Sequence, residues 1–182
     1  MFAKDEVCWF PMRVTYNREL TVKKELDALG IENFVPMHYE LREKDGARKR
    51  VLVPAVHNLI FVRSTQDTLT ELKNTRRELA PLRYIVRRML EDDRTEIIVV
   101  PDRQMENFMR VASIETDDVM FLDCTDYICR VGKRVRIVEG PFAGVEGVIK
   151  RIKNNKHVVV QVEGLAAVGI TFVPPSLLQA VD

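Results

Sequence analysis

The chain has 182 residues, 46% of them hydrophobic and 30% charged, which is enough apolar sequence for a packed core and argues against disorder. Its formal net charge of +1 points to no particular partner. No apolar run reaches the roughly 20 residues that a membrane-spanning helix needs, and the acidic residues in MFAKDEVCWF argue against a signal peptide. We therefore expect a cytoplasmic protein of one or two domains.

Charge is distributed unevenly along the chain. Residues 130–182 hold eight of the 28 Lys and Arg but only four of the 27 Asp and Glu, so positive charge is in excess there and negative charge before it. This difference predicts two modules with different partners. The three cysteines form no CxxC motif and the three histidines are far apart, so we expect reduced thiols and neither a metal nor another cofactor.

The first predicted elements are a strand and a helix. CWFPMRVTY at 8–16 is rich in β-branched and aromatic residues and predicts a strand, in which Pro11 requires an open side or a bulge. Asn17 is placed to cap a helix over 18–30, and Gly30 is placed to end it. The apolar stripe of this helix consists of Val22, Leu26 and Leu29.

A charged hairpin and a second helix follow. The segments 31–41 and 51–64 predict two strands, joined by a charged tip whose turn is Asp45-Gly46. A serine or threonine at 64–65 begins the next helix, whose apolar residues are Leu69, Leu72 and Leu79.

A strand and a helix complete the first module. The alternation in 81–88 predicts a half-exposed strand, and Pro101 and Asp102 suit the first turn of a helix over 101–114. The buried stripe predicted for this helix is Met105, Phe108, Met109 and Ala112. The order β-α-β-β-α-β-α predicts an α+β domain over 5–114 with the ferredoxin-like, split βαβ arrangement, an antiparallel sheet with helices on one side.

The rest of the chain predicts a linker and an all-β module. The acidic segment 115–129 lacks clear periodicity, and we interpret it as the linker. From 130 to 182 short strands alternate with turns, as in a small SH3-like β-barrel. We expect three glycines to allow positive φ and close backbone approach where the barrel bends, namely Gly140, Gly144 and Gly147.

The glycine-rich stretch VGKRVRIVEGPFAGVEGVI does not read as a phosphate-binding loop, because no helix and no GK[ST] follow it. It resembles the KOW motif instead, which ribosomal proteins and other RNA-associated barrels also carry. The early Trp9, the TYNRE turn into a helix, ALGIENFVPM and the strand LIFV resemble the N-terminal domain of NusG-like transcription elongation factors. TYNREL, LDALGIENFVPM and the short acidic connector are most similar to UpxY-type paralogues, which act on capsular-polysaccharide operons.

The resemblance implies that the N-terminal domain binds the clamp helices of the RNA polymerase β′ subunit. Bridging the main cleft there favours the closed clamp, so pausing falls and read-through rises without any enzymatic step. The polymerase-facing groove corresponds in this chain to Trp9, Val56, His57, Asn58, Leu59 and Phe61. We expect Leu59 and Asn58 at the surface, whereas Phe61 also fits core packing. Many relatives have Pro-Gly-Tyr at positions 57–59, so the clamp contact differs in detail here.

The resemblance also implies contacts with non-template DNA and nascent RNA. The corresponding residues are Tyr16, Arg18, Thr70, Lys73, Arg76 and Arg77, which offer cations for phosphates and a ring for base stacking. Solvated helix charges are the alternative interpretation of each cation. The hairpin tip is a further candidate contact for upstream DNA, through Lys44, Arg48, Lys49 and Arg50.

The KOW module implies protein partners, either Rho or a small ribosomal protein that couples transcription to translation. Its candidate contacts are Phe142, Ile149, Lys150 and Arg151, although a solubilising charged surface also explains the two cations. We expect a monomer without a membrane partner.

The sequence also allows three other functions to be considered. A general NusG factor would aid Rho instead of opposing it. A ribosome-associated KOW protein would be basic throughout, which residues 1–129 are not. An enzyme is disfavoured because Asp92-Asp93 and Asp117-Asp118 lie in turn or linker sequence and no nucleophile–base set is visible.

Overall fold

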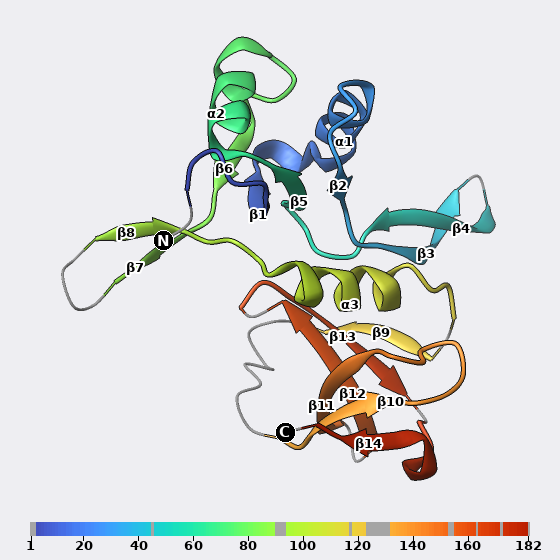
Figure 1. Ribbon diagram of the computed structural model, residues 1–182. Helices are drawn as coiled ribbons and strands as arrows, with labels where there is room; N and C mark the ends of the chain where they lie inside the picture. Colours follow the sequence, from blue (N-terminus) through green and yellow to red (C-terminus); the bar gives the residue numbers. More distant parts are fainter. Residues whose placement is uncertain are drawn as a thin grey trace. The chain divides into compact units, whose positions relative to one another are not determined.

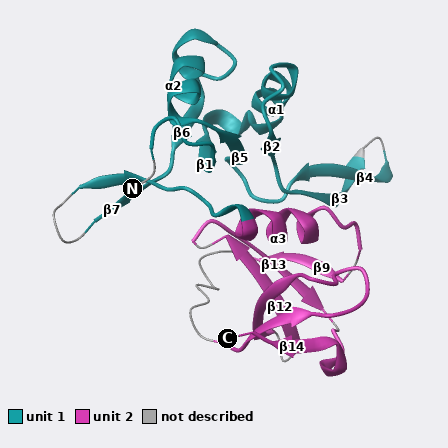
Figure 2. Ribbon diagram, in the orientation of Figure 1, with its two compact units in different colours: residues 1–102 teal, residues 103–182 magenta. Residues whose placement is uncertain are grey.

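The chain is described by a computed structural model that divides into two compact units, residues 1–102 and 103–182 (Figure 2). The residues described are 3–44, 46–89, 94–116, 118–122, 132–152, 155–162, 164–171 and 173–181. The predicted domain boundaries, 5–114, 115–129 and 130–182, stay a prediction.

The first unit contains the expected succession of strands and helices, with an extra short hairpin near its end (Figure 1). Its elements are β1 (Cys8–Val14), α1 (Glu19–Ala28), β2 (Asn33–Phe34), β3 (Met37–Lys44), β4 (Ala47–Pro54), β5 (Leu59–Ser64), α2 (Gln66–Thr75), β6 (Leu82–Tyr84), β7 (Val86–Arg88) and β8 (Thr95–Ile97). The helix α3 (Asp102–Ala112) begins at the last residue of this unit.

The main sheet has the strand order β2-β5-β1-β6, and every neighbouring pair is antiparallel. This order confirms the ferredoxin-like arrangement. Pro11 lies in the central strand β1, yet the N–H group that proline lacks would form no hydrogen bond with a neighbouring strand. Val14 N–H donates to the Asn58 carbonyl on the β5 side, and donors alternate along a strand, so the Pro11 nitrogen faces β6, whose pairing begins only at Met12.

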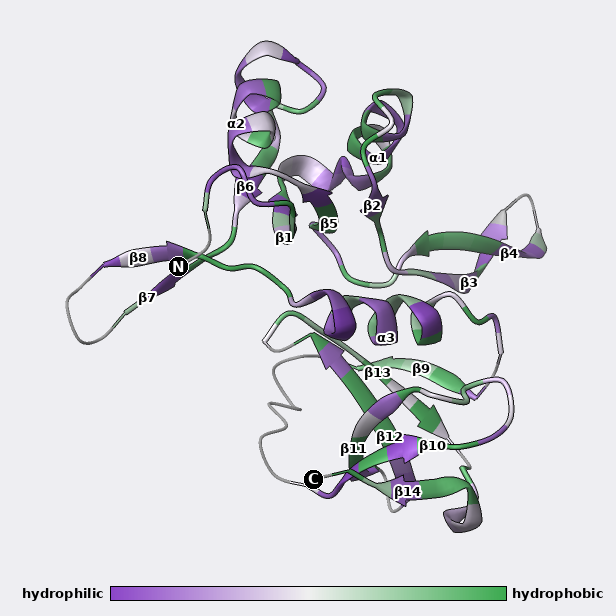
Figure 3. Cartoon of the chain, in the orientation of Figure 1, coloured by the Kyte–Doolittle hydropathy of each residue, from purple (hydrophilic) through white to green (hydrophobic). Residues whose placement is uncertain are grey.

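The core of the first unit lies between one face of this sheet and the two helices α1 and α2. The buried side chains that meet there include Phe10, Met12, Val14, Val22, Leu26, Ile60, Val62, Leu69, Leu79 and Leu82. In Figure 1 both helices lie on the same side of β1 and β5, which agrees with this cluster. The strands that supply it, such as β5, take the hydrophobic colour in Figure 3.

Helix ends were predicted with mixed success. Gly30 adopts φ +69 after α1, as a glycine that ends a helix does. Thr65 precedes α2 and its Oγ1 accepts the N–H of Thr68 at 3.1 Å, which confirms the predicted cap. The prediction for Asn17 was wrong. Arg18 occupies the N-cap position of α1 without a side-chain hydrogen bond, because Asn17 itself lies in a 3-10 turn with φ +51.

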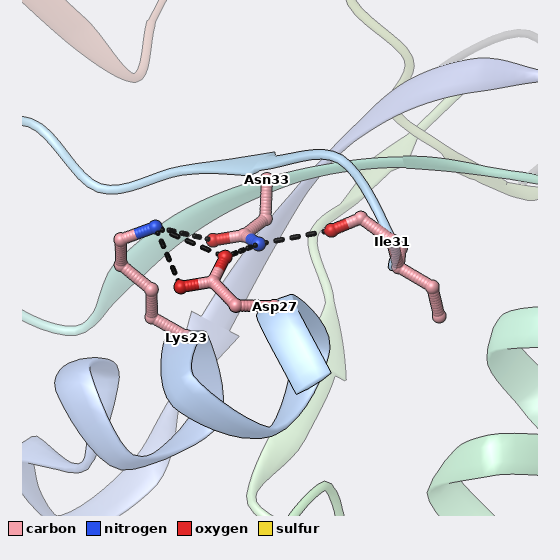
Figure 4. A network of polar contacts seen from close by, with 4 residues as sticks. All are labelled: Lys23, Asp27, Ile31 and Asn33. Carbon is pink, nitrogen blue, oxygen red and sulfur yellow. Dashed lines mark hydrogen bonds and ion pairs between the residues drawn. The ribbon is translucent and has the colours of Figure 1, made fainter. Parts of the chain in front are cut away.

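A polar network fastens the end of α1 to β2 (Figure 4). Lys23 Nζ lies 3.1 Å from one oxygen of Asp27 and 3.4 Å from Asn33 Oδ1. Asn33 Nδ2 in turn donates to Asp27 Oδ1 at 2.7 Å and to the Ile31 carbonyl at 3.0 Å. The amide of Asn33, more than the ammonium, lowers the pKa of the Asp27 carboxyl. The network connects the last turns of α1 to the residues that lead into β2.

Two predicted strands are each divided in the structure. The segment 51–64 is broken by a turn at 55–58, so β4 pairs with β3 in a separate two-stranded hairpin and β5 joins the main sheet. Likewise 81–88 gives β6 to the main sheet and β7 to a hairpin with β8. At the β3–β4 tip Gly46 adopts φ +73, as predicted, and Asp45 lies outside the described residues.

The second unit contains α3 and a six-stranded antiparallel sheet. Its strands are β9 (Val119–Leu122), β10 (Arg134–Ile137), β11 (Glu146–Ile152), β12 (Asn155–Val162), β13 (Ala166–Thr171) and β14 (Leu178–Ala180). They follow the order β14-β10-β11-β12-β13-β9, which confirms the predicted all-β module. In α3 the buried stripe is Met105, Phe108, Val111 and Ala112, with Val111 in the place expected for Met109.

The strand β9 differs from the predicted linker over 115–129. Leu122 pairs with Ala167 and Val119 with Ile170, so the run VMFL adds an edge strand to the sheet. Acidic residues on both sides of these four apolar residues hid the strand from periodicity. Most of the remaining linker, including residues 123–129, lies outside the described residues.

The glycines of the second unit have the two roles predicted for them. Gly140 and Gly144 both adopt φ +86 in the turn between β10 and β11. Gly147 instead allows close approach, since a Cβ there would lie 2.7 Å from the Val159 carbonyl oxygen.

Candidate functional site

The main sheet has a second face, which points away from α1 and α2 and is largely apolar. Strand pairing puts Pro11 beside Phe61 and Phe61 beside Phe34, while Phe10 and Met12, one residue along β1, point to the helices. The residues that share this second face are Trp9, Pro11, Phe34, Leu59 and Phe61, together with the cations Arg13, Arg63 and Arg83.

The predicted polymerase contacts divide into buried and accessible side chains. Trp9 is 2% exposed and Phe61 is fully buried, so Phe61 does have the packing role that we considered. Leu59 was expected at the surface and this was wrong: it is 4% exposed, and it lies two residues before Phe61 on the same apolar face of β5. Val56 and Asn58 are half-buried and His57 is exposed, all within the turn at 55–58.

Asn58 is held by hydrogen bonds from two directions. Its backbone lies in the left-handed region with φ +60, where non-glycine residues are uncommon. Its carbonyl accepts the Val14 N–H at 2.9 Å, and its own N–H donates to the carboxylate of Glu19. Glu19 is 3% exposed at the start of α1, so it is a buried carboxylate with a backbone partner.

The adjacent turn presents an aromatic ring to solvent. Tyr16 adopts φ +65 and is 83% exposed, and the guanidinium of Arg18 lies 5.9 Å from its ring centroid. Thr15 N–H donates to the Pro81 carbonyl at 3.2 Å, which ties this turn to the start of β6. Tyr16, Asn17 and Asn58 thus bring three left-handed residues to one end of the sheet. Each costs of order 1–3 kcal/mol, and such strain is concentrated at functional sites.

The predicted nucleic-acid residues of α2 lie in a different setting. Thr70 Oγ1 is 3.1 Å from the Tyr84 hydroxyl. Lys73 Nζ lies over the same ring, 4.4 Å from its centroid, in a cation–π contact. Burial, and secondarily the charge of Arg83, lowers the pKa of Lys73, and burial raises the pKa of Tyr84.

Two arginines near the end of α2 are exposed. Arg76 is 3.5 Å from Glu25 of α1, and Arg77 follows it. The structure therefore brings Tyr16 and Arg18 together, and separately Thr70 and Lys73. At the β3–β4 tip the described cations Arg48, Lys49 and Arg50 are exposed, and the guanidinium of Arg50 lies 4.7 Å from the centroid of the Tyr39 ring.

The predicted partner surface of the second unit does not form one face. Ile149 and Arg151 alternate with Lys150 along β11, so Lys150 points to the opposite side of the sheet. Phe142 is 9% exposed in the turn after Gly140. Of the four residues, only Arg151 is classed as exposed.

Three further polar residues near the candidate sites were not predicted from the sequence. Glu19 looks like an ordinary helix glutamate, and Tyr84 like one residue of a half-exposed strand. The signal for Glu146 was present, since Arg136 pairs with it across the predicted turn and Arg134 lies two residues before Arg136 on the same strand. The hydrogen bond from Arg136 lowers the pKa of this carboxyl, and the charges of Arg103 and Arg134 act in the same direction. Together they outweigh burial, which raises the pKa.

Within the described residues, no group of His, Cys, Asp and Glu is arranged to hold a metal ion. Over the same residues, no helix has the length and apolar character to cross a bilayer. The carboxylates Asp92, Asp93 and Asp117 lie outside the described residues.

Comparison with known proteins agrees with this architecture. The family model described as transcription termination factor NusG matches residues 7–109, and the KOW motif model matches residues 131–163. A search of curated proteins found no match. The first match covers more than half of the chain and includes both candidate turns. The chain belongs to the NusG family of transcription elongation and termination factors, which interact with RNA polymerase and are not enzymes.

Proposed function

We propose that this protein is an operon-specific antitermination factor of the UpxY type. Its first unit binds the clamp helices of RNA polymerase, reduces pausing and promotes read-through of its target operons. Capsular-polysaccharide operons are the proposed targets, on the likeness of TYNREL and LDALGIENFVPM to that subgroup. The proposed location is the cytoplasm, where transcription takes place.

The observation that supports this proposal is the physical link between the two candidate turns. The turn with His57 and Asn58 is hydrogen-bonded through Val14 and Glu19 to the segment that presents Tyr16. A polymerase contact at the turn with His57 and Asn58 therefore fixes the position of the exposed Tyr16 ring and of Arg18. This is the combination that a factor needs to hold polymerase and an unpaired strand together.

Each residue then has a defined task. His57 and Asn58 contact the clamp, and Tyr16 stacks on a base of the non-template strand, an interaction worth about 1–3 kcal/mol. Arg18 and Arg77 neutralise phosphates. Trp9, Leu59 and Phe61 are proposed as the apolar anchors of the clamp contact, which requires their face to become accessible when polymerase binds.

The mechanism is a shift between two clamp states. The factor binds the closed clamp better than the open one, so its binding increases the population of the closed state. The size of this shift is set by the ratio of the two affinities. The second unit then recruits a further protein, Rho or a small ribosomal protein, through the surface near Arg151. A factor of this family that recruits Rho would increase termination, and this is the second candidate function.

Single-round transcription with a bacterial RNA polymerase tests the proposal. The template carries the operon leader, a pause and a Rho-dependent terminator. We expect the protein to shorten the pause and to increase read-through. Tyr16→Ala is expected to raise the concentration needed for half of the effect about tenfold, the equivalent of roughly 1.4 kcal/mol. Arg18→Gln should act in the same direction.

Lys24→Gln is the matched control, because it removes an exposed cation of α1 that belongs to neither turn. An equal loss in Lys24→Gln and Arg18→Gln would show that only overall charge matters. Increased Rho termination would favour the general factor. If elongation complexes that carry the leader neither bind the protein nor respond to it, the antitermination proposal is wrong.

A further inference from the structure

A cluster of three arginines surrounds one carboxylate in the second unit. Glu146, the first residue of β11, accepts hydrogen bonds through Oε1 from Arg103 and from Arg136, whose Nε lies at 2.9 Å. Arg134 Nη2 lies 3.9 Å from the other carboxylate oxygen.

The cluster carries more positive charge than it neutralises. Three guanidinium groups face one carboxylate, which leaves an excess of two positive charges. The Glu146 side chain is 11% exposed, whereas those of Arg103 and Arg134 are 70% and 60% exposed. The anion therefore lies at the base of the cluster and the cations face solvent, an arrangement open to a second anion.

Regular structure holds the cluster in place. Arg136 is directly opposite Glu146 in the β10–β11 ladder, and on its other side it pairs with Gln179 of β14. Arg134 lies two residues earlier on the same face, about 7 Å along the strand. Arg103 comes from the first turn of α3. Because two arginines share a strand and both are tethered to one carboxylate, little freedom is lost when a ligand binds.

We propose that Arg103, Arg134 and Arg136 form a binding site for the phosphates of a single-stranded nucleic acid, and that Glu146 is the positioning residue that orients them. Guanidinium groups donate charge-assisted hydrogen bonds to phosphate oxygens. Arg134 and Arg136 project from one face of β10 and both reach Glu146, so neighbouring phosphates of one strand can contact both guanidinium groups. An acidic protein segment would match this arrangement only where every second residue is acidic, whereas every unit of a nucleic acid strand carries a phosphate.

This site differs from the nucleic-acid contacts of the first unit and from the partner surface near Arg151. It gives the KOW module a direct role in holding a strand. The proposal does not rest on the antitermination activity, because it concerns binding to free nucleic acid in the absence of polymerase.

Salt-dependent binding of the full chain tests the site. Fluorescence anisotropy is measured with labelled single-stranded RNA and single-stranded DNA oligonucleotides of the same sequence over a range of salt concentrations. Each phosphate contact with a single strand contributes about 0.7 to the slope of log affinity against log salt. The double variant Arg134→Gln/Arg136→Gln is therefore expected to lower that slope by about 1.4 and to bind several-fold more weakly at low salt. A larger loss with RNA than with DNA would identify the transcript as the ligand, and the reverse would identify the displaced DNA strand.

Two further variants complete the test. Lys156→Gln removes an exposed cation from β12 of the same unit and is expected to leave the slope unchanged. Glu146→Gln adds one net positive charge, so a purely electrostatic surface would bind more tightly. The positioning role predicts weaker binding instead. Circular dichroism of each variant verifies the fold.

The proposal is overturned if the double variant keeps the wild-type slope, or if Lys156→Gln lowers the slope per charge by as much as the double variant. Tighter binding by Glu146→Gln would overturn the positioning role. None of these results depends on polymerase, so they leave the function of the first unit to its own test.

Discussion

Replacing Glu19 with alanine is expected to destabilise the first unit and to release the turn that carries Asn58. The Glu19 carboxylate is 3% exposed and accepts the Asn58 N–H, so its removal leaves a half-buried donor without that acceptor. Asn58 also keeps its left-handed backbone, with φ +60, without the interaction that holds it there.

The size of the effect follows from these contacts. A hydrogen bond to a charged group contributes roughly 1.5–3 kcal/mol. We therefore expect Glu19→Ala to cost about 2 kcal/mol of unfolding free energy. Glu19→Gln keeps an acceptor of the same shape and should cost less than half as much. Asn58→Gly keeps the N–H and relieves the left-handed strain, so we expect it to be neutral or slightly stabilising.

Trp9 allows the first unit to be followed within the whole chain. It is the single tryptophan of the sequence and is 2% exposed on β1. Urea unfolding followed by Trp9 fluorescence should show the midpoint of Glu19→Ala lowered by about 1 M, for a slope of about 2 kcal/mol per M. The same variant should need a higher concentration to act in the transcription assay.

Two results would refute this reasoning. A midpoint within about 0.3 M of wild type would mean that the buried hydrogen bond contributes almost nothing. Equal losses in Glu19→Ala and Glu19→Gln would mean that charge, and not the acceptor at Asn58, is what matters.

Three further predictions concern stability and ionisation. Gly147→Ala should lower the thermal unfolding temperature of the second unit more than Gly164→Ala, because its Cβ would lie 2.7 Å from the Val159 carbonyl oxygen. At Gly164 the added Cβ meets nothing within 4 Å, so only the left-handed backbone, with φ +74, opposes the alanine. The lowered pKa of Glu146 means that its contribution is present above its ordinary value of 4.5 and is lost as pH falls through the lowered pKa; acid unfolding should show this loss, and Glu146→Gln should abolish it. Burial raises the pKa of Tyr84, so spectrophotometric titration should show one tyrosine still protonated above pH 10.0, and Tyr84→Phe should remove that late step.

Most of the fold was predictable because its signals are local. The stripe of α1, the threonine before α2 and the glycine after α1 each act within a few residues of sequence. The glycine-rich turn of the second unit was equally clear, since its residues must adopt positive φ or allow close approach. Even the gap in pairing beside Pro11 on β1 was predictable, because proline has no backbone N–H to donate.

The candidate site was less predictable because its contacts join distant parts of the chain. Periodicity showed that Leu59 and Phe61 share a face, but whether that face is buried depends on what folds beside it. The hydrogen bond from Asn58 to Glu19 spans 39 positions and has no sequence signal. Tyr16 was identified as a candidate, whereas its left-handed backbone was not, because asparagine and glycine are the usual residues there.

The pairing of β9 with β13 changes where the KOW module can be cut. A fragment that starts at residue 130 would lack β9 and would leave one side of β13 with unpaired N–H and C=O groups from Ala167 to Ile170. Such an edge is a template for pairing with other chains. Grafts that exchange modules between related factors should therefore join ahead of Val119, outside the limits of the matched motif. A hybrid protein joined at the motif itself would expose β13 and self-associate. If such a hybrid were inactive in transcription, the result would not identify the partner that the KOW module recruits.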